Sequence, residues 1–181
     1  MGRAKALLPG PEGKTFVRHL VDVLAEGGCA PVVVVLGPSG EAVLAEAGDL
    51  APALVAFNRD SRTEMIDSVR LGERYLPADV TAALVAPVDA PCVTAALVRA
   101  LAAAAEAAPD AAIVPVAGGR SGHPVVLPRA ALWRTEAAAG LRALLESGAV
   151  AVRTLDWDDP RIAADVNTPE DHASLFPGWT T

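Results

Sequence analysis

Six apolar runs of strand length constrain the fold of this chain more than any other feature. They span Val32 to Leu36, Ala53 to Phe57, Ala82 to Val88, Ala111 to Val116, Pro124 to Leu127 and Val150 to Leu155. A strand with one solvent-exposed face alternates apolar and polar residues, whereas an unbroken apolar run is typical of a strand buried on both faces. The runs therefore predict a sheet that is covered on both sides.

Helical patterns lie between most of these runs. Residues Lys14 to Glu26 carry an apolar face and stop at Gly27 and Gly28, Thr94 to Ala108 begins at a capping threonine, and Glu136 to Ser147 ends before a glycine. Strands that alternate with helices predict an α/β fold with a mostly parallel sheet, and the 181 residues suit a single domain. Ligands in such folds bind at the carboxyl ends of the strands.

Charge narrows the set of partners. A net charge of −7 and a pI near 4.9 argue against nucleic acid as a partner, because a polyphosphate backbone would be repelled. A small phosphorylated ligand would need a metal ion or local cations, and the candidates are Arg3, Lys5, Arg62 and Arg70. Cys29 and Cys92 lack metal-type spacing, and no stretch approaches the ~18 apolar residues of a membrane span, so we expect a cytoplasmic protein with no membrane partner.

Two acidic segments follow apolar runs. Asp89, in Pro87-Val88-Asp89-Ala90-Pro91, stands where a buried run opens into a loop, a position suited to holding Mg²⁺. An aspartate in a turn stiffened by two prolines would explain this segment equally well. In the second segment, Asp165 to Asp171, the sequence Thr-Pro-Glu-Asp is a strong helix start, and Asp165 and Asn167 precede the cap. We expect Asp89 and Asp165 to converge at one edge of the sheet and to share one Mg²⁺.

Three further features are open to two interpretations each. The segment Gly118 to Pro124 sets His123 among glycines, as either a mobile loop over a cleft or a tight structural connection. Ser68 and Arg70 could belong to the polar face of a helix. His19 and His172 fall in helical patterns and are expected at the surface or in an interface.

The order of these segments resembles the MobA-like nucleotidyltransferases, most narrowly the molybdenum cofactor cytidylyltransferases. The matching pieces are Met1 to Pro9, the valine strand ending in Leu36-Gly37, Asn58 with Ser68 to Gly72, Pro87 to Pro91, Gly122-His123-Pro124-Val125 and Asp165 to Asp171. The resemblance covers nearly the whole chain and implies a Rossmann-like three-layer α/β/α fold of the nucleotide-diphospho-sugar transferase type. Gly-His-Pro-Val before a strand points to the cytidylyl branch.

The resemblance also implies an activity: transfer of a nucleoside monophosphate, CMP from CTP, to a phosphate-bearing acceptor such as the molybdopterin cofactor, with release of pyrophosphate. Asp89 and Asp165 would hold Mg²⁺, and Lys5 would neutralise phosphate charge as the third catalytic residue. Arg3, Lys5, Asn58 and Ser68 would bind the nucleotide, and Gly122 and His123 would lie on the acceptor side. A molybdoenzyme or its maturation factor would be a further partner.

Two departures from the family pattern stand out. The family opens with a strand and a glycine-bearing phosphate loop that ends in Arg-Met-Gly, and this chain begins at the Met of that motif, so we expect residues 1–181 to be an N-terminally truncated nucleotidyltransferase domain. In the family that strand lies between the Val32 to Leu36 and Ala82 to Val88 strands. In addition, Asn167 stands where cytidylyl members usually carry Asp and guanylyl relatives often carry Asn.

Three interpretations of function stay open on the sequence. The first is a molybdopterin cytidylyltransferase, and the second is a relative that uses GTP or a sugar-phosphate or phospholactate acceptor. The third is a non-catalytic cofactor-handling homologue that lacks the phosphate loop. For the missing strand, the alternatives are a start codon assigned too late, another segment that fills the gap, and a structure that contains a hole there.

Overall fold

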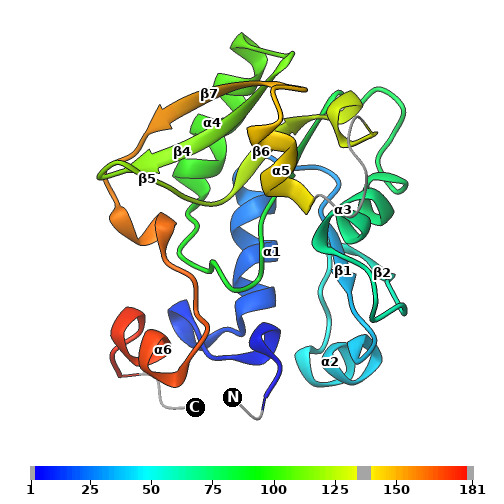
Figure 1. The fold of residues 1–181 in the computed structure, drawn as a ribbon. Helices are drawn as coiled ribbons and strands as arrows, with labels where there is room; N and C mark the ends of the chain where they lie inside the picture. Colours follow the sequence, from blue (N-terminus) through cyan, green and yellow to red (C-terminus); the bar gives the residue numbers. More distant parts are fainter. Residues whose placement is uncertain (1–2, 134–139, 179–181) are drawn as a thin grey trace.

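The computed structural model describes residues 3–133 and 140–178, and its helices and strands alternate along most of the chain (Figure 1). The helices are α1 (Phe16–Glu26), α2 (Gly40–Ala47), α3 (Met65–Glu73), α4 (Ala95–Ala107), α5 (Gly140–Glu146) and α6 (Pro169–Leu175). Short 3-10 helices are η1 (Lys5–Leu7), η2 (Pro11–Gly13), η3 (Arg129–Trp133) and η5 (Pro160–Ala163). None of the described helices is long and apolar enough to cross a membrane.

The strands form two sheets. Strands β1 (Val33–Leu36) and β2 (Leu54–Phe57) pair in parallel as a sheet of their own. The larger sheet contains β3 (Ala82–Val85), β4 (Ala111–Ala117), β5 (Arg120–Ser121), β6 (Val125–Pro128) and β7 (Ala151–Asp156). Its β4 and β7 are parallel, whereas β6 runs antiparallel to both β3 and β4. The expected α/β fold is confirmed, and the sheet is mixed because β5 and β6 follow β4 through a hairpin.

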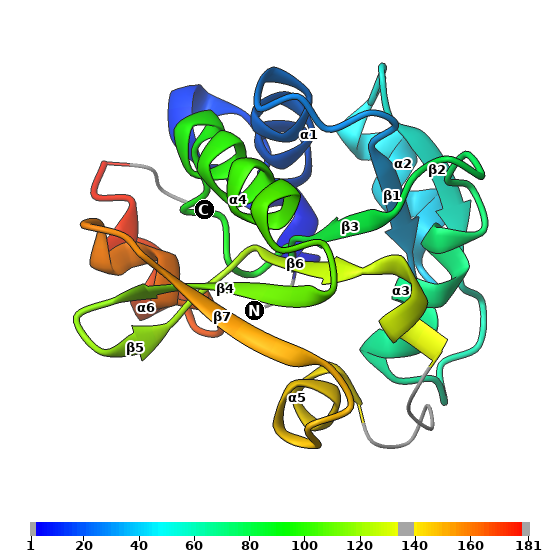
Figure 2. The ribbon, with the colours of Figure 1, turned by 90° about the horizontal axis from the view of Figure 1, so that it is seen from above.

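Helices cover both faces of the larger sheet (Figure 2). On one face, Leu97 and Leu101 of α4 pack against Ile113 and Val126. On the other face, α5 packs with α3 and η3 in a cluster of buried residues that contains Ile66, Leu127, Leu132, Leu141 and Leu144. The apolar run that forms β4 is buried along nearly its whole length, because both of its faces are covered.

The helix boundaries follow the local signals in the sequence. The side chains of Thr15, Thr94 and Thr168 accept hydrogen bonds from the first turns of α1, α4 and α6. Helix α1 ends at Gly27, as the sequence predicts. The helix expected over 136–147 is observed from Gly140, and its first residues, 136–139, lie outside the described part of the chain.

Candidate active site

A cluster of polar side chains surrounds the ammonium group of Lys5 and forms the candidate site. Lys5 Nζ donates to Asp89 Oδ2 at 3.0 Å and to Asn167 Oδ1 at 2.6 Å. Lys5 belongs to η1, Asp89 follows β3, and Asn167 precedes α6, so three distant segments meet at one ammonium group. The Lys5 and Asp89 side chains are 32% and 33% exposed. A small anionic ligand can therefore reach them.

Asp165 lies beside this cluster because its segment is tied to the Asp89 loop. The backbone N–H of Val166 donates to the carbonyl of Asp89 at 2.7 Å, and the Asp165 side chain is exposed. The two acidic segments therefore meet through their backbones, although Asp165 follows η5 and not a strand as expected. The cap of α6 uses Thr168 and Asp171 instead, and the backbone N–H groups of Asn167 and Thr168 lower the pKa of the Asp171 carboxyl.

His123 contributes an imidazole side chain to the site. Its backbone N–H donates to the Ile162 carbonyl at 2.9 Å, while its side-chain Nδ1 is buried and has no hydrogen-bond partner in the described structure. Burial lowers the pKa of His123 below its ordinary value of 6.5, and the charges of Asp165 and Asp89 oppose this shift. Burial thus favours the neutral form of the imidazole, which lies close enough to both carboxylates to feel their charge.

The glycine-rich segment before β6 begins with a hairpin turn, which is the geometry of a tight connection. Gly118 and Gly119, with φ of 56° and 77°, form the turn between β4 and β5. The N–H of Gly122 then donates to the Pro115 carbonyl at 2.8 Å. A Cβ on Gly122 would lie 2.5 Å from the Ile162 carbonyl oxygen, so only glycine allows the two backbones to approach this closely. This close approach of the two backbones explains why a glycine stands at position 122.

Asn58 and Ser68 form a second polar cluster. Asn58 follows β2, and its Nδ2 donates to Ser68 Oγ on α3 at 3.0 Å and to Thr63 Oγ1 at 2.8 Å. The sequence indicated Asn58 and Ser68 but not Thr63, which lies in a polar turn with no distinguishing pattern. The Asn58 side chain is thereby held at the carboxyl end of β2.

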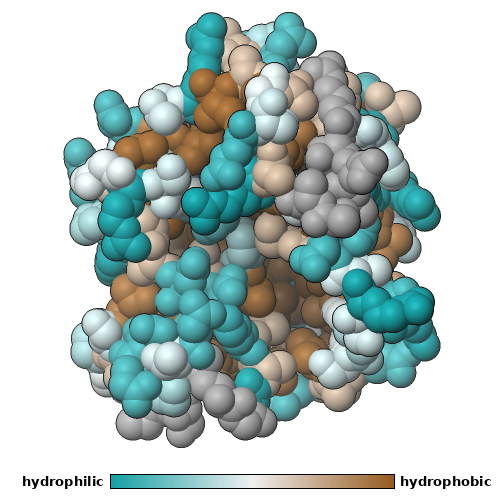
Figure 3. Space-filling model, viewed as in Figure 1, coloured by the Kyte–Doolittle hydropathy of each residue, from teal (hydrophilic) through white to brown (hydrophobic). Residues whose placement is uncertain are grey.

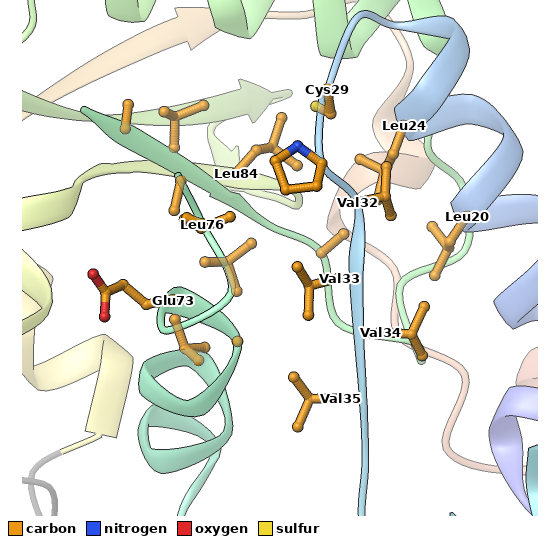
Figure 4. Close-up of a pocket in the computed structure, with 18 of the residues that line it drawn as sticks. Leu20, Leu24, Cys29, Val32, Val33, Val34, Val35, Glu73, Leu76 and Leu84 are labelled. Carbon is orange, nitrogen blue, oxygen red and sulfur yellow. The ribbon is translucent and has the colours of Figure 1, made fainter. Parts of the chain in front are cut away.

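A cavity of about 970 Å³ connects the two clusters, because Ser68 and Asp89 both line it. The remaining lining is largely apolar and comes from α1, β1, α3 and β3 (Figure 4). In the space-filling view the molecule is hollowed near its centre, and apolar surface lies within the hollow between more polar rims (Figure 3). The cavity therefore reaches from polar groups at the strand ends into the interior.

The other three cations that the sequence indicated make their contacts in other parts of the fold. Arg3 pairs with Glu46 of α2, and Arg62 pairs with its neighbour Asp60 at 2.9 Å. Arg70 donates to the Leu132 carbonyl at 2.8 Å, and its guanidinium lies over the ring of Trp133. Of the four cations that the sequence indicated, Lys5 is the one that contacts Asp89.

His172 supports the site in a way that the sequence did not indicate, because it is buried inside the domain and not at the surface or in an interface as expected. The side chain is 1% exposed, and Nε2 lies 2.6 Å from the Pro9 carbonyl oxygen. The ring packs among Phe16 and Phe176. His172 therefore links the segment just after Lys5 to the helix just after Asn167, and a lone histidine in a helical pattern gives no signal of such a role.

The oxygen-bearing side chains of the site suit a hard divalent cation that is also coordinated by the phosphates of the substrate. Asp89 and Asp165 carry carboxylates on two segments that are joined by the Val166-to-Asp89 backbone hydrogen bond, and the Asn167 amide oxygen shares Lys5 Nζ with Asp89. No group of three His, Cys, Asp or Glu side chains in residues 3–133 and 140–178 could hold a metal alone. Mg²⁺ commonly uses one or two carboxylates together with substrate phosphates, so the residues fit such an ion.

Comparison with known proteins gives a consistent assignment. The model of the MobA-like NTP transferase domain matches residues 1–155. Nicotine blue oxidoreductase of Paenarthrobacter nicotinovorans is 33% identical over 189 residues, which cover 94% of this chain and 87% of that protein.

Solved structures agree in fold. Rv0371c from Mycobacterium tuberculosis H37Rv superposes with a TM-score of 0.84 at 26% identity, covering 97% of this chain and 90% of that one. The same protein was also crystallised in complex with manganese. The 2-C-methyl-D-erythritol 4-phosphate cytidylyltransferase from Thermus thermophilus has a TM-score of 0.67 at 18% identity, over 94% and 91% of the two chains, and shares the fold. This chain belongs to the MobA-like NTP transferase family and is an enzyme of the nucleotidyltransferase type.

Proposed function

We propose that this protein transfers CMP from CTP to the phosphate of the molybdopterin cofactor and releases pyrophosphate. The observation that carries the proposal is the meeting of Lys5, Asp89 and Asn167 at the carboxyl ends of the strands, beside Asp165. A cation placed beside carboxylates suits phosphoryl transfer, because catalysis of this reaction is positioning plus charge neutralisation.

In the proposed reaction an oxygen of the acceptor phosphate attacks the α-phosphorus of the nucleotide. The bond from that phosphorus to the oxygen bridging to the β-phosphate breaks, and pyrophosphate leaves with the electron pair. Lys5 neutralises charge on the triphosphate, for which it must exchange part of its present contact with Asp89. Asp89 and Asp165 would hold Mg²⁺, which supplies electrophilic stabilisation of the phosphate oxygens.

The two ends of the site would serve the two substrates. On the nucleotide side, Asn58 and Ser68 offer an amide and a hydroxyl to the base, and Arg3 becomes available to phosphate if it leaves Glu46. On the acceptor side, the neutral His123 offers its unpartnered Nδ1 as a hydrogen-bond group. Gly122 keeps the backbone close to Ile162 and so fixes where His123 lies.

The test is pyrophosphate release from each of the four nucleoside triphosphates with Mg²⁺ and molybdopterin. We expect turnover with CTP, and we expect Asp89→Asn to lower kcat by at least about 10²-fold with the fold intact. Asp110→Asn is the matched control, since Asp110 is exposed and precedes β4, away from the site. Equal turnover by Asp89→Asn and Asp110→Asn would remove Asp89 from the mechanism. Turnover with GTP alone would replace the cytidylyl assignment with a guanylyl one, for which Asn167 is suited.

A second candidate follows from the 33% identity to a protein named as an oxidoreductase. In that case the apolar cavity would hold an organic redox substrate instead of a nucleotide. Oxidation of NADH or NADPH in the presence of an aromatic dye, without pyrophosphate release from any triphosphate, would favour it.

A further inference from the structure

The polar side chains of the Lys5 site are carried by segments that meet in one apolar cluster. Each of Lys5, Asp89 and Asn167 lies one to three residues from a member of this cluster. The position of each polar group therefore depends on how its own segment packs there. The buried apolar members are Leu8, Phe16, Val166 and Phe176, and Val88 packs against them.

His172 of α6 places one polar group inside this cluster. Its ring centroid lies 5.8 Å from that of Phe16 and 5.6 Å from that of Phe176. Nε2 lies 2.6 Å from the Pro9 carbonyl oxygen, which can only accept, so Nε2 carries the hydrogen and donates it. The side chain is 1% exposed, so water cannot replace this hydrogen bond unless the cluster opens.

The hydrogen bond from His172 fixes the segment that carries Lys5. The N–H of Leu8 donates to the Lys5 carbonyl at 3.1 Å and closes a turn directly before Pro9. The carbonyl of Leu8 accepts from the N–H of Phe16 at 3.0 Å, at the start of α1. The turn is thus held to α1 by Leu8 and to α6 by the donor nitrogen of His172, and Figure 1 shows α6 beside this first part of the chain.

The residue that precedes His172 fixes the other partner of Lys5. The carboxylate of Asp171 accepts the backbone N–H of Asn167 at 2.9 Å, as part of the cap of α6. Two consecutive residues of α6 therefore hold the backbone of Asn167 and the carbonyl of Pro9. The contact of 2.6 Å between Lys5 Nζ and Asn167 Oδ1 joins the two segments that these residues hold.

We propose that His172 is a positioning residue for Lys5, whose ammonium group it keeps at the Asp89 and Asn167 oxygens through the hydrogen bond to Pro9. Without the donor nitrogen the Pro9 carbonyl loses its partner on α6, and the turn moves away from α6 together with Lys5. His172 lies behind the site and acts only through Lys5. The contact of Lys5 with substrate phosphates rests on the function proposed above, whereas its placement by His172 does not.

Acylation measures the placement of Lys5 directly, because the chain contains two lysines, Lys5 and Lys14. An N-hydroxysuccinimide ester of acetic acid labels both, and peptide mass spectrometry gives the ratio of the two rates with Lys14 as the internal reference. We expect His172→Leu, which has no donor, to raise the Lys5-to-Lys14 ratio by about three- to tenfold, the factor that one hydrogen bond contributes.

Two variants separate the hydrogen bond from the packing of the ring. His172→Gln has an amide that can reach the Pro9 carbonyl, so its labelling ratio should stay within about twofold of the wild type. Phe176→Leu is the matched control, because it removes a ring from the same cluster and leaves the hydrogen bond from His172 in place. Its labelling ratio should also stay within about twofold of the wild type.

Binding of inorganic tripolyphosphate with Mg²⁺, measured by calorimetry, tests the coupling to Lys5 with a probe that has neither base nor acceptor. We expect His172→Leu to weaken binding by about three- to tenfold, and to cause no further loss in a chain that already carries Lys5→Met. A full additional loss in the double variant would overturn the proposal, since His172 would then act by another route. Raised labelling of Lys5 with unchanged tripolyphosphate binding would support its placement by His172 and refute its role toward phosphate.

The labelling experiment can also overturn the proposal by itself. Unchanged labelling of Lys5 in His172→Leu would do so, and so would equal rises in His172→Leu and Phe176→Leu. If His172→Leu does not fold, His172→Asn, whose shorter side chain keeps the amide away from Pro9, must show the same rise relative to His172→Gln, or the proposal fails.

Discussion

Gly122→Ala tests whether the site depends on the close contact between the hairpin and η5. The new Cβ would lie 2.5 Å from the Ile162 carbonyl oxygen and 2.8 Å from its carbonyl carbon, which are backbone atoms that cannot rotate aside. This carbonyl also accepts the His123 N–H at 2.9 Å. The substitution must therefore push η5 away from the hairpin and weaken that hydrogen bond.

The size of the effect follows from these two contributions. Overpacking costs about 1–3 kcal/mol, and a weakened hydrogen bond costs about 0.5–1.5 kcal/mol. A loss near 3 kcal/mol in the free energy of unfolding corresponds to a fall in Tm of about 6–12 °C for a chain of this length. Since η5 leads to Asp165, we also expect kcat to fall in the folded variant.

Thermal and urea unfolding measure the first effect, with Gly37→Ala as the matched control. A Cβ on Gly37 meets no atom within 4 Å, and its φ is not positive, so we expect its stability to change by less than about 0.5 kcal/mol. Indistinguishable unfolding midpoints for Gly122→Ala and Gly37→Ala would refute the argument that the backbone contact excludes a side chain.

Two further predictions concern the titratable groups. Lys5→Met should lower kcat/KM for the triphosphate by about 10²–10³-fold but cost less than about 1 kcal/mol of stability, because the Lys5–Asp89 pair is a third exposed. The control is Lys14→Met, which breaks the pairs with Glu12 and Asp22 and should leave kcat/KM unchanged. Equal losses of kcat/KM in the two variants would contradict the assignment of Lys5. The pKa of His123 is lower in the folded protein than in the unfolded chain, so below about pH 6.5 the unfolded state binds more protons and stability falls as pH drops toward the folded pKa. Urea unfolding between about pH 7 and pH 5 should therefore show a shallower loss of stability for His123→Gln than for the wild type, and parallel pH profiles would show that His123 does not contribute.

Local sequence signals predicted the elements well, because they act over a few residues. Threonines at 15, 94 and 168 begin helices, and the unbroken apolar runs are strands. The polar residues that follow strand ends also predicted the site, since the carboxyl ends of strands in an α/β fold meet at one edge. This reasoning holds for Asp89, which follows β3. Lys5 belongs to η1 and Asp165 follows the short helix η5, so strand ends do not explain why their segments meet Asp89.

Tertiary structure alone decided the remaining features. The direction of β6, the burial of His172 beneath Pro9, and the contact of Thr63 with Asn58 depend on which segments meet across the fold. The hairpin at Gly118 and Gly119 is defined by the pairing of β4 with β5, which belongs to the tertiary structure. Sequence periodicity specifies that a strand is buried, but the neighbour that buries it is chosen by long-range packing. For the same reason the valine run at β1 is typical of an interior strand, while the structure leaves one of its edges facing an open slot.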